Sequence, residues 1–96
     1  MHTVNKSQRD EAEKLVFEII SYIFSDENRL GAFLGTTGMD VEDLKTDLMN
    51  SEVQTGILEY LLGREDLLMN FCDTYSVHPG YPKKAASILS GVTPDW

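Results

Sequence analysis

Apolar residues recur at the helical period along almost the whole 96-residue chain, and this spacing constrains the fold more than any other feature. In the first such segment they fall on one face at 100° per residue: Ala12, Leu15, Val16, Ile19, Ile20 and Ile23. Similar groups follow within residues 30–34, 41–48, 53–62, 67–75 and 85–89. No stretch alternates apolar and polar residues over a useful length, as a half-buried strand would. The pattern predicts an all-α fold, a compact bundle of five or six short helices.

Capping residues divide this pattern into separate helices. Ser7, with acidic residues behind it, is predicted to begin a first helix over residues 7–24. Ser25 is predicted to cap the second helix, because two acidic residues follow it. Ser51 is predicted to cap a later helix, with Gln54 as its capping-box partner.

Glycine and proline mark further boundaries. Gly38 suits the left-handed position that follows a helix, and Asp40 is predicted to cap the helix after it. Gly63 is a natural helix end, and Pro82 fits the first turn of a last helix. Together these signals predict a single helical domain over residues 7–91. They also predict a flexible segment on each side of it, over residues 1–6 and residues 92–96.

The chain also resembles itself when it is shifted by 38 residues. Residues 19–33 (IISYIFSDENRLGAF) then lie on residues 57–71 (ILEYLLGREDLLMNF). Five of the fifteen positions are identical: Ile19/Ile57, Tyr22/Tyr60, Glu27/Glu65, Leu30/Leu68 and Phe33/Phe71. Chance would give about one identity at ordinary residue frequencies. One explanation is similar packing in two unrelated helix pairs. The other is an internal repeat of two three-helix units, over residues 15–50 and 53–90, which the matched Tyr and Glu favour.

The charge of the chain restricts its partners. Sixteen acidic residues against eight basic ones give a formal net charge of −8. Such a chain is repelled by phosphate backbones, so no nucleic-acid partner is expected. The one basic doublet, Lys83-Lys84, is too small to reverse this expectation.

Neither a membrane nor a secretory pathway is indicated. The start of the chain is polar and lacks the apolar core of a signal peptide. The most apolar run, residues 15–24, contains Glu18 and is about half as long as a membrane span. A cytoplasmic location without membrane contact is therefore expected.

Residues 34–44, LGTTGMDVEDL, invite several functional interpretations. No strand precedes them and no Lys follows in place, which excludes a phosphate-binding loop. The spacing of the acidic residues does not fit a calcium loop, and Asp40, Asp43 and Asp47 are best explained as a solvated helix face. A helix-turn-helix resemblance remains, but its second helix would present carboxylates to DNA.

No catalytic or cofactor-binding arrangement is indicated. Cys72 is the sole cysteine and lies among apolar residues, as a buried small side chain would. His78 lies in the VHPG break, with Tyr81 nearby, and these two form the weak candidate for a small site. Nothing in the sequence orients the His78 side chain for catalysis. We therefore expect that the protein is not an enzyme and that it has no metal ligands and no cofactor.

Surplus apolar surface is the strongest functional signal in the sequence. Phe17, Tyr22 and Phe24 are the residues expected to form an interaction surface, because short helices cannot hide every aromatic side chain.

Three motifs in the chain resemble those of a family of short all-helical proteins of unknown function, common in alphaproteobacteria. The first comprises Asp26, Glu27, Arg29, Leu30, Phe33 and Leu34, and the second Thr37, Gly38, Met39 and Asp40. The third comprises Leu61, Leu62, Glu65, Leu67, Leu68 and Phe71. The resemblance covers roughly residues 12–90 and departs from the family at SVHPGYPKK, where a Gly-apolar-Asp-Pro turn is usual. It implies an all-helical fold and carries no activity, cofactor or catalytic residue.

These observations favour a non-enzymatic protein that acts through protein–protein contact or as an accessory protein. A homodimer is one form that such contact could take. The alternative hypothesis is a degenerate helix-turn-helix-type regulator without strong DNA binding.

Overall fold

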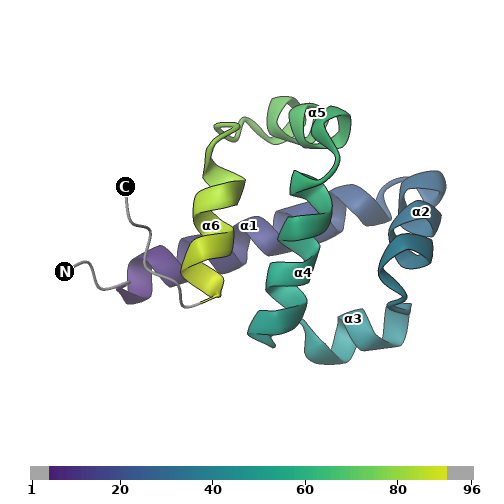
Figure 1. Ribbon diagram of the computed structural model, residues 1–96, viewed down its shortest axis with the longest axis horizontal. Helices are drawn as coiled ribbons and strands as arrows, with labels where there is room; N and C mark the ends of the chain where they lie inside the picture. The colour runs from purple at the N-terminus through teal and green to yellow at the C-terminus, as the bar shows by residue number, and fades with distance from the viewer. Residues whose placement is uncertain (1–4, 91–96) are drawn as a thin grey trace.

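The computed structural model describes residues 5–90, which form six α-helices and no strand (Figure 1). In chain order the helices are α1 (Lys6–Phe24), α2 (Glu27–Thr37), α3 (Val41–Asp47), α4 (Ser51–Leu62), α5 (Glu65–Tyr75) and α6 (Tyr81–Leu89). The prediction of a compact all-α bundle of short helices is confirmed. Within residues 5–90, no helix has the length and apolar character needed to cross a membrane.

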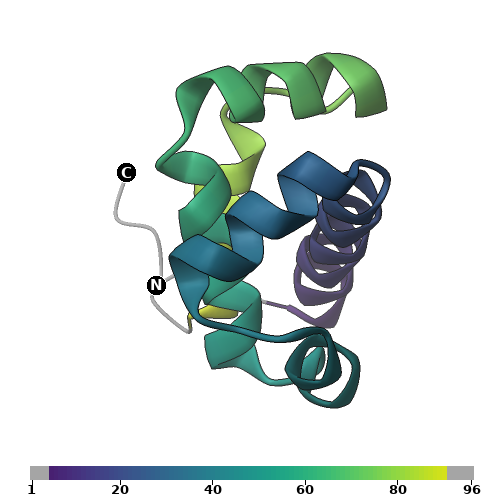
Figure 2. The same cartoon turned by 90° about the vertical axis from the view of Figure 1, so that its right-hand side faces the viewer.

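The long helix α1 forms one side of the bundle. Helices α4 and α6 lie side by side and cross it, and α6 packs against both α1 and α4 (Figure 1). Helices α3 and α5 lie at opposite edges of the bundle, as the two views show (Figures 1 and 2). One continuous apolar core fills the space between the helices, and α1 contributes six buried residues to it: Ala12, Leu15, Val16, Ile19, Tyr22 and Ile23.

Two aromatic contacts join the halves of the chain in a reciprocal way. The ring of Tyr22 in α1 packs edge-on against Phe71 in α5, with ring centroids 5.4 Å apart. The ring of Phe33 in α2 packs edge-on against Tyr60 in α4, with centroids 4.9 Å apart. Tyr22 and Tyr60, like Phe33 and Phe71, are the residues matched by the 38-residue shift. Each half therefore supplies a tyrosine to the other half's phenylalanine, as two units related by a two-fold axis would.

The resemblance between the halves is incomplete. Helix α1 begins at Lys6, whereas the residue matched to the start of α4 at Ser51 is Glu13. Helix α6 packs on both α1 and α4, while its counterpart α3 makes no comparably extensive contact with either helix. The internal repeat stays a prediction, which the reciprocal aromatic contacts agree with.

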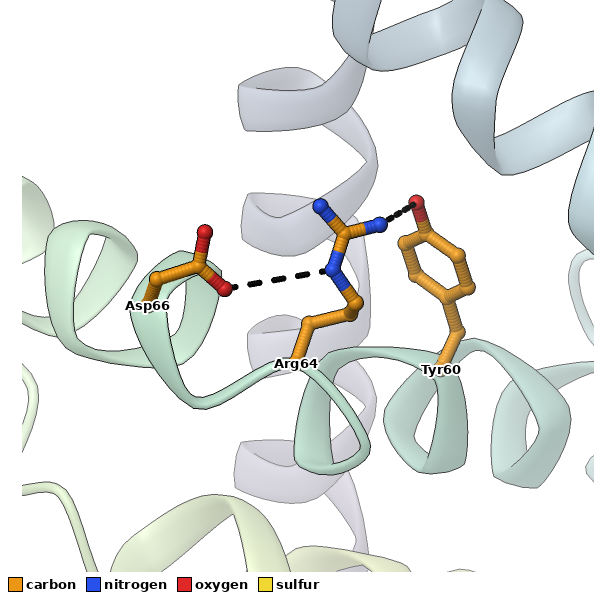
Figure 3. A network of polar contacts seen from close by, with 3 residues as sticks. All are labelled: Tyr60, Arg64 and Asp66. Atoms are coloured by element: carbon orange, nitrogen blue, oxygen red, sulfur yellow. Dashed lines mark hydrogen bonds and ion pairs between the residues drawn. The ribbon is translucent and has the colours of Figure 1, made fainter.

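An arginine accompanies each of the two tyrosines. The guanidinium carbon of Arg29 lies 3.9 Å from the centre of the Tyr22 ring, a cation–π arrangement. In the other half, Arg64 donates to the Tyr60 hydroxyl at 3.5 Å and lies 3.8 Å from an Asp66 oxygen (Figure 3). Tyr22 is also anchored by its hydroxyl, which donates to the Asn70 side chain of α5.

Several predicted helix boundaries are confirmed. Gly38 ends α2 with φ 74°, the left-handed conformation that glycine adopts without strain. Asp40 caps α3 and forms a reciprocal capping box with Asp43. Gly63 follows α4, and Pro82 lies in the first turn of α6.

Three predicted serine caps are wrong. The cap of α1 is Asn5, whose side chain accepts from the backbone N–H of Gln8, so Ser7 lies inside the helix. Lys6 is already helical, which shortens the segment expected to be flexible. Residues 1–4, residue 91 and the predicted tail at 92–96 lie outside the described residues.

At the other two predicted caps, a residue next to the serine caps the helix instead, because its side-chain oxygen accepts from the backbone N–H groups of the first turn. Asp26, not Ser25, caps α2 and accepts from two backbone N–H groups. Ser25 instead donates to the carbonyl oxygen of Tyr22 at the end of α1. Asn50, not Ser51, caps α4 by accepting from two N–H groups of the first turn. Gln54 makes no capping box and is a fully buried side chain.

The reciprocal aromatic pairs predict matched losses of stability. Phe33→Leu and Phe71→Leu keep most of the buried apolar volume but remove the edge-on ring contacts. We expect each to lower the free energy of unfolding by about 1–2 kcal/mol in urea denaturation. Phe17→Leu, at an exposed position, should change it by less than about 0.5 kcal/mol. Losses at Phe33 or Phe71 no larger than at Phe17 would contradict the role given to these pairs.

The cap of α4 predicts different effects at two neighbouring positions. Asn50→Ala removes the acceptor for two backbone N–H groups and should lower the free energy of unfolding by about 1 kcal/mol. Ser51→Ala leaves that cap intact and should cost less than about 0.5 kcal/mol. Thermal or urea unfolding of the two variants measures the difference, and a larger effect at Ser51 would reverse the assignment.

Candidate interaction surface

Two large aromatic side chains project from one face of α1. Phe17 is 40% exposed and Phe24 is 38% exposed. They are seven residues apart, nearly two full helical turns, so both point to the same side of the helix about 10 Å from each other along its axis. No neighbouring helix buries either ring. These two residues therefore form an open apolar stripe.

Tyr22 does not belong to this surface, which corrects the expectation from the sequence. Its side chain is only 3% exposed and packs against Phe71 and Tyr75. Tyr22 is five residues from Phe17, which places it roughly 140° further round the helix. That rotation carries the ring into the core.

Met49 also belongs to the surface, although no pattern in the sequence singles it out. It lies in the turn between α3 and α4 and is 70% exposed. Met49 and Phe17 line a hollow of about 250 Å³ together with Asp10, Glu13 and Lys14 of α1. The surface thus has an apolar floor, formed by a phenylalanine and a methionine, beside charged side chains. We call Phe17, Phe24, Met49 and Glu13 the α1 surface.

A buried glutamine holds Glu13 in place. The side-chain nitrogen of Gln54 donates to a Glu13 carboxylate oxygen at 3.0 Å and to the carbonyl oxygen of Leu48 at 2.9 Å. Gln54 is fully buried, and its own side-chain oxygen has no hydrogen-bond partner among the residues that the structure describes. The contact ties α1 to the start of α4 and fixes the carboxylate at the edge of the hollow. The spacing of apolar residues does not reveal this role, because Gln54 occupies an otherwise apolar helix face.

The carboxylates beside the hollow are not neutralised by ion pairs. Within residues 5–90, the one ion pair between a basic and an acidic side chain joins Arg64 and Asp66 on another part of the molecule. Asp10 and Glu13 face the hollow with Lys14 as the one basic residue of its lining. The lining therefore carries an excess of negative charge, as the chain does as a whole.

The weak candidate site at His78 has a structural role in the turn before α6. The Nδ1 atom of His78 accepts from the backbone N–H of Gly80 at 2.9 Å, and its carbonyl oxygen accepts from the Tyr81 N–H at 2.9 Å. Burial, and then the charges of Glu11 and Glu18, raise the pKa of the Tyr81 hydroxyl. A raised pKa keeps this hydroxyl protonated, so it is poorly suited to act as a base.

Cys72 is buried, as expected, and 4% of it is exposed. Burial, and then the negative charge of Asp73, raise the pKa of its thiol. Both effects disfavour the reactive thiolate. Among residues 5–90, no three His, Cys, Asp or Glu side chains are grouped to hold a metal ion.

Helix α3, the second helix of the helix-turn-helix resemblance, is predominantly acidic on its exposed side. Its exposed residues are Glu42, Asp43, Lys45, Thr46 and Asp47. Three carboxylates against one ammonium would be repelled by DNA phosphates. The side chains on this helix therefore do not suit base or phosphate contact.

Comparison with known proteins gives a family without an assigned role. No curated protein and no solved structure matches the chain. Residues 9–92 match the family described as "Protein of unknown function (DUF3572)". This range includes α2 to α6 and all of α1 except its first three residues, and the family resemblance expected from the sequence is confirmed. The chain belongs to the DUF3572 family.

Proposed function

We propose that this chain is a non-enzymatic protein-interaction domain that binds its partner through the α1 surface. The supporting observation is that the aromatic side chains of this chain differ in how far they are exposed. Tyr22, Tyr60, Phe33 and Phe71 are all less than 10% exposed. Phe17 and Phe24 stay 40% and 38% exposed on one face of α1, and neither belongs to the buried core.

The composition of the α1 surface fits protein contact. Aromatic residues and methionine are enriched in protein–protein interfaces, where they fill pockets of the partner. A stripe with residues seven positions apart suits a helix lying along or across α1. The other candidate sites are less suited to binding a partner, because the His78 side chain accepts a hydrogen bond within a turn and the exposed side of α3 is acidic.

Charge placed in the stripe tests this function. Phe17→Asp/Phe24→Asp should abolish a partner complex, because loss of one buried aromatic anchor costs about 2 kcal/mol or more and weakens binding about 30-fold. Tagged full-length protein is expressed in its native cells, and the complex is measured by co-purification and by sedimentation mass. Circular dichroism should show unchanged helicity.

Met69→Asp is the matched control. Met69 is 46% exposed on α5 and does not line the hollow beside Phe17. The control should retain the sedimentation mass and the co-purifying proteins of the unmodified chain. If the double variant also retains both, the α1 surface is not the binding site and the proposal fails.

A further inference from the structure

We infer that the partner segment bound by the α1 surface is a basic amphipathic helix, with a Lys or Arg side chain placed at Glu13. This inference rests on the proposed function and adds the chemistry of the partner. It follows from three features of the surface: an apolar stripe, a fixed carboxylate and an excess of negative charge.

The apolar stripe sets the shape of the partner. Phe17 and Phe24 are about 10 Å apart along α1, the distance between positions seven residues apart on a facing helix. Met49 lines the same hollow as Phe17 and has a flexible side chain that can adapt to different partners. An amphipathic helix with apolar residues at positions i, i+3, i+4 and i+7 meets such a stripe along its length.

The fixed carboxylate sets the charge of the partner. Gln54 donates to one Glu13 oxygen, and no described basic side chain forms an ion pair with Glu13 or Asp10. Glu13 is half-buried, so it has already lost part of its hydration before a partner binds. A Lys or Arg next to the apolar contact would gain a charge-assisted hydrogen bond there. Lys14 lines the same hollow, but the two carboxylates outweigh it.

The net charge argues against a second copy as the occupant. Two chains with a net charge of −8 each repel one another, and the lining of the hollow has the same sign as the whole molecule. A basic segment would be attracted at long range and then held by the apolar contacts.

Two synthetic peptides of equal length test the inference. Both carry leucine at helical i, i+3, i+4 and i+7 positions over eighteen residues, and they differ in having Lys or Glu at the flanking positions. Fluorescence anisotropy with the full-length chain measures both affinities at moderate salt. The Lys peptide should bind at least about tenfold more tightly than the Glu peptide.

Three variants separate a specific site from general attraction to an acidic protein. Phe17→Asp adds a negative charge, so general attraction would strengthen binding of the Lys peptide, whereas the inference predicts at least a tenfold loss. Glu13→Gln should weaken it about three- to tenfold. Glu42→Gln removes the same charge from an exposed position on α3 and should leave the affinity within about twofold.

Three other results would overturn the inference. If both peptides bind equally well and Phe17→Asp weakens both, the apolar surface binds a helix but does not prefer a basic one. No binding of the Lys peptide, or equal losses at Glu13 and Glu42, would remove the site itself. Sedimentation of the unmodified chain as a dimer that Phe17→Asp dissociates would make a second copy the occupant. The proposed function is judged separately, by co-purification with the native partner.

Discussion

Two reciprocal contacts between tyrosine and phenylalanine, together with the packing of α6 on α1, hold the two halves of this bundle together. Tyr22 packs on Phe71, and Phe33 packs on Tyr60, so each aromatic pair draws one ring from each half. Neither half can complete its core alone, because its buried phenylalanine needs the tyrosine of the other. The tyrosine hydroxyls reach polar groups at the edge of the core, at Asn70 and Arg64, which orients the rings as well as burying them.

In this arrangement, some large apolar side chains of α1 are not needed to form the core. The core face of the helix carries Tyr22 and packs against α2, α4, α5 and α6, while Phe17 and Phe24 lie outside the buried core. Gln54 reaches from the start of α4 to Glu13, so this contact joins α1 to α4 and also fixes a carboxylate beside Phe17. Within the α1 surface, Glu13 is thus fixed by a contact to the buried Gln54.

The sequence predicted the fold more fully than the surface. Helical spacing is a local property, and it located all six helices, while the left-handed Gly38 and the Asp40 cap followed from local chemistry. The misplaced caps arose where two adjacent polar residues could serve and only the backbone geometry decides between them. Tyr22 and Met49 show the same limit at the surface, because their exposure depends on which distant helix covers them.

Site-specific photo-crosslinking in native cells tests whether the α1 surface binds a basic amphipathic helix. A photoreactive phenylalanine analogue is placed at position 17, and at position 69 as the control. Position 17 is expected to crosslink to another protein, within a basic amphipathic helix, and position 69 is not expected to crosslink to that protein. Crosslinks to the same protein from position 69, crosslinks to an acidic segment, or the absence of any crosslink from position 17 would contradict this role of the α1 surface.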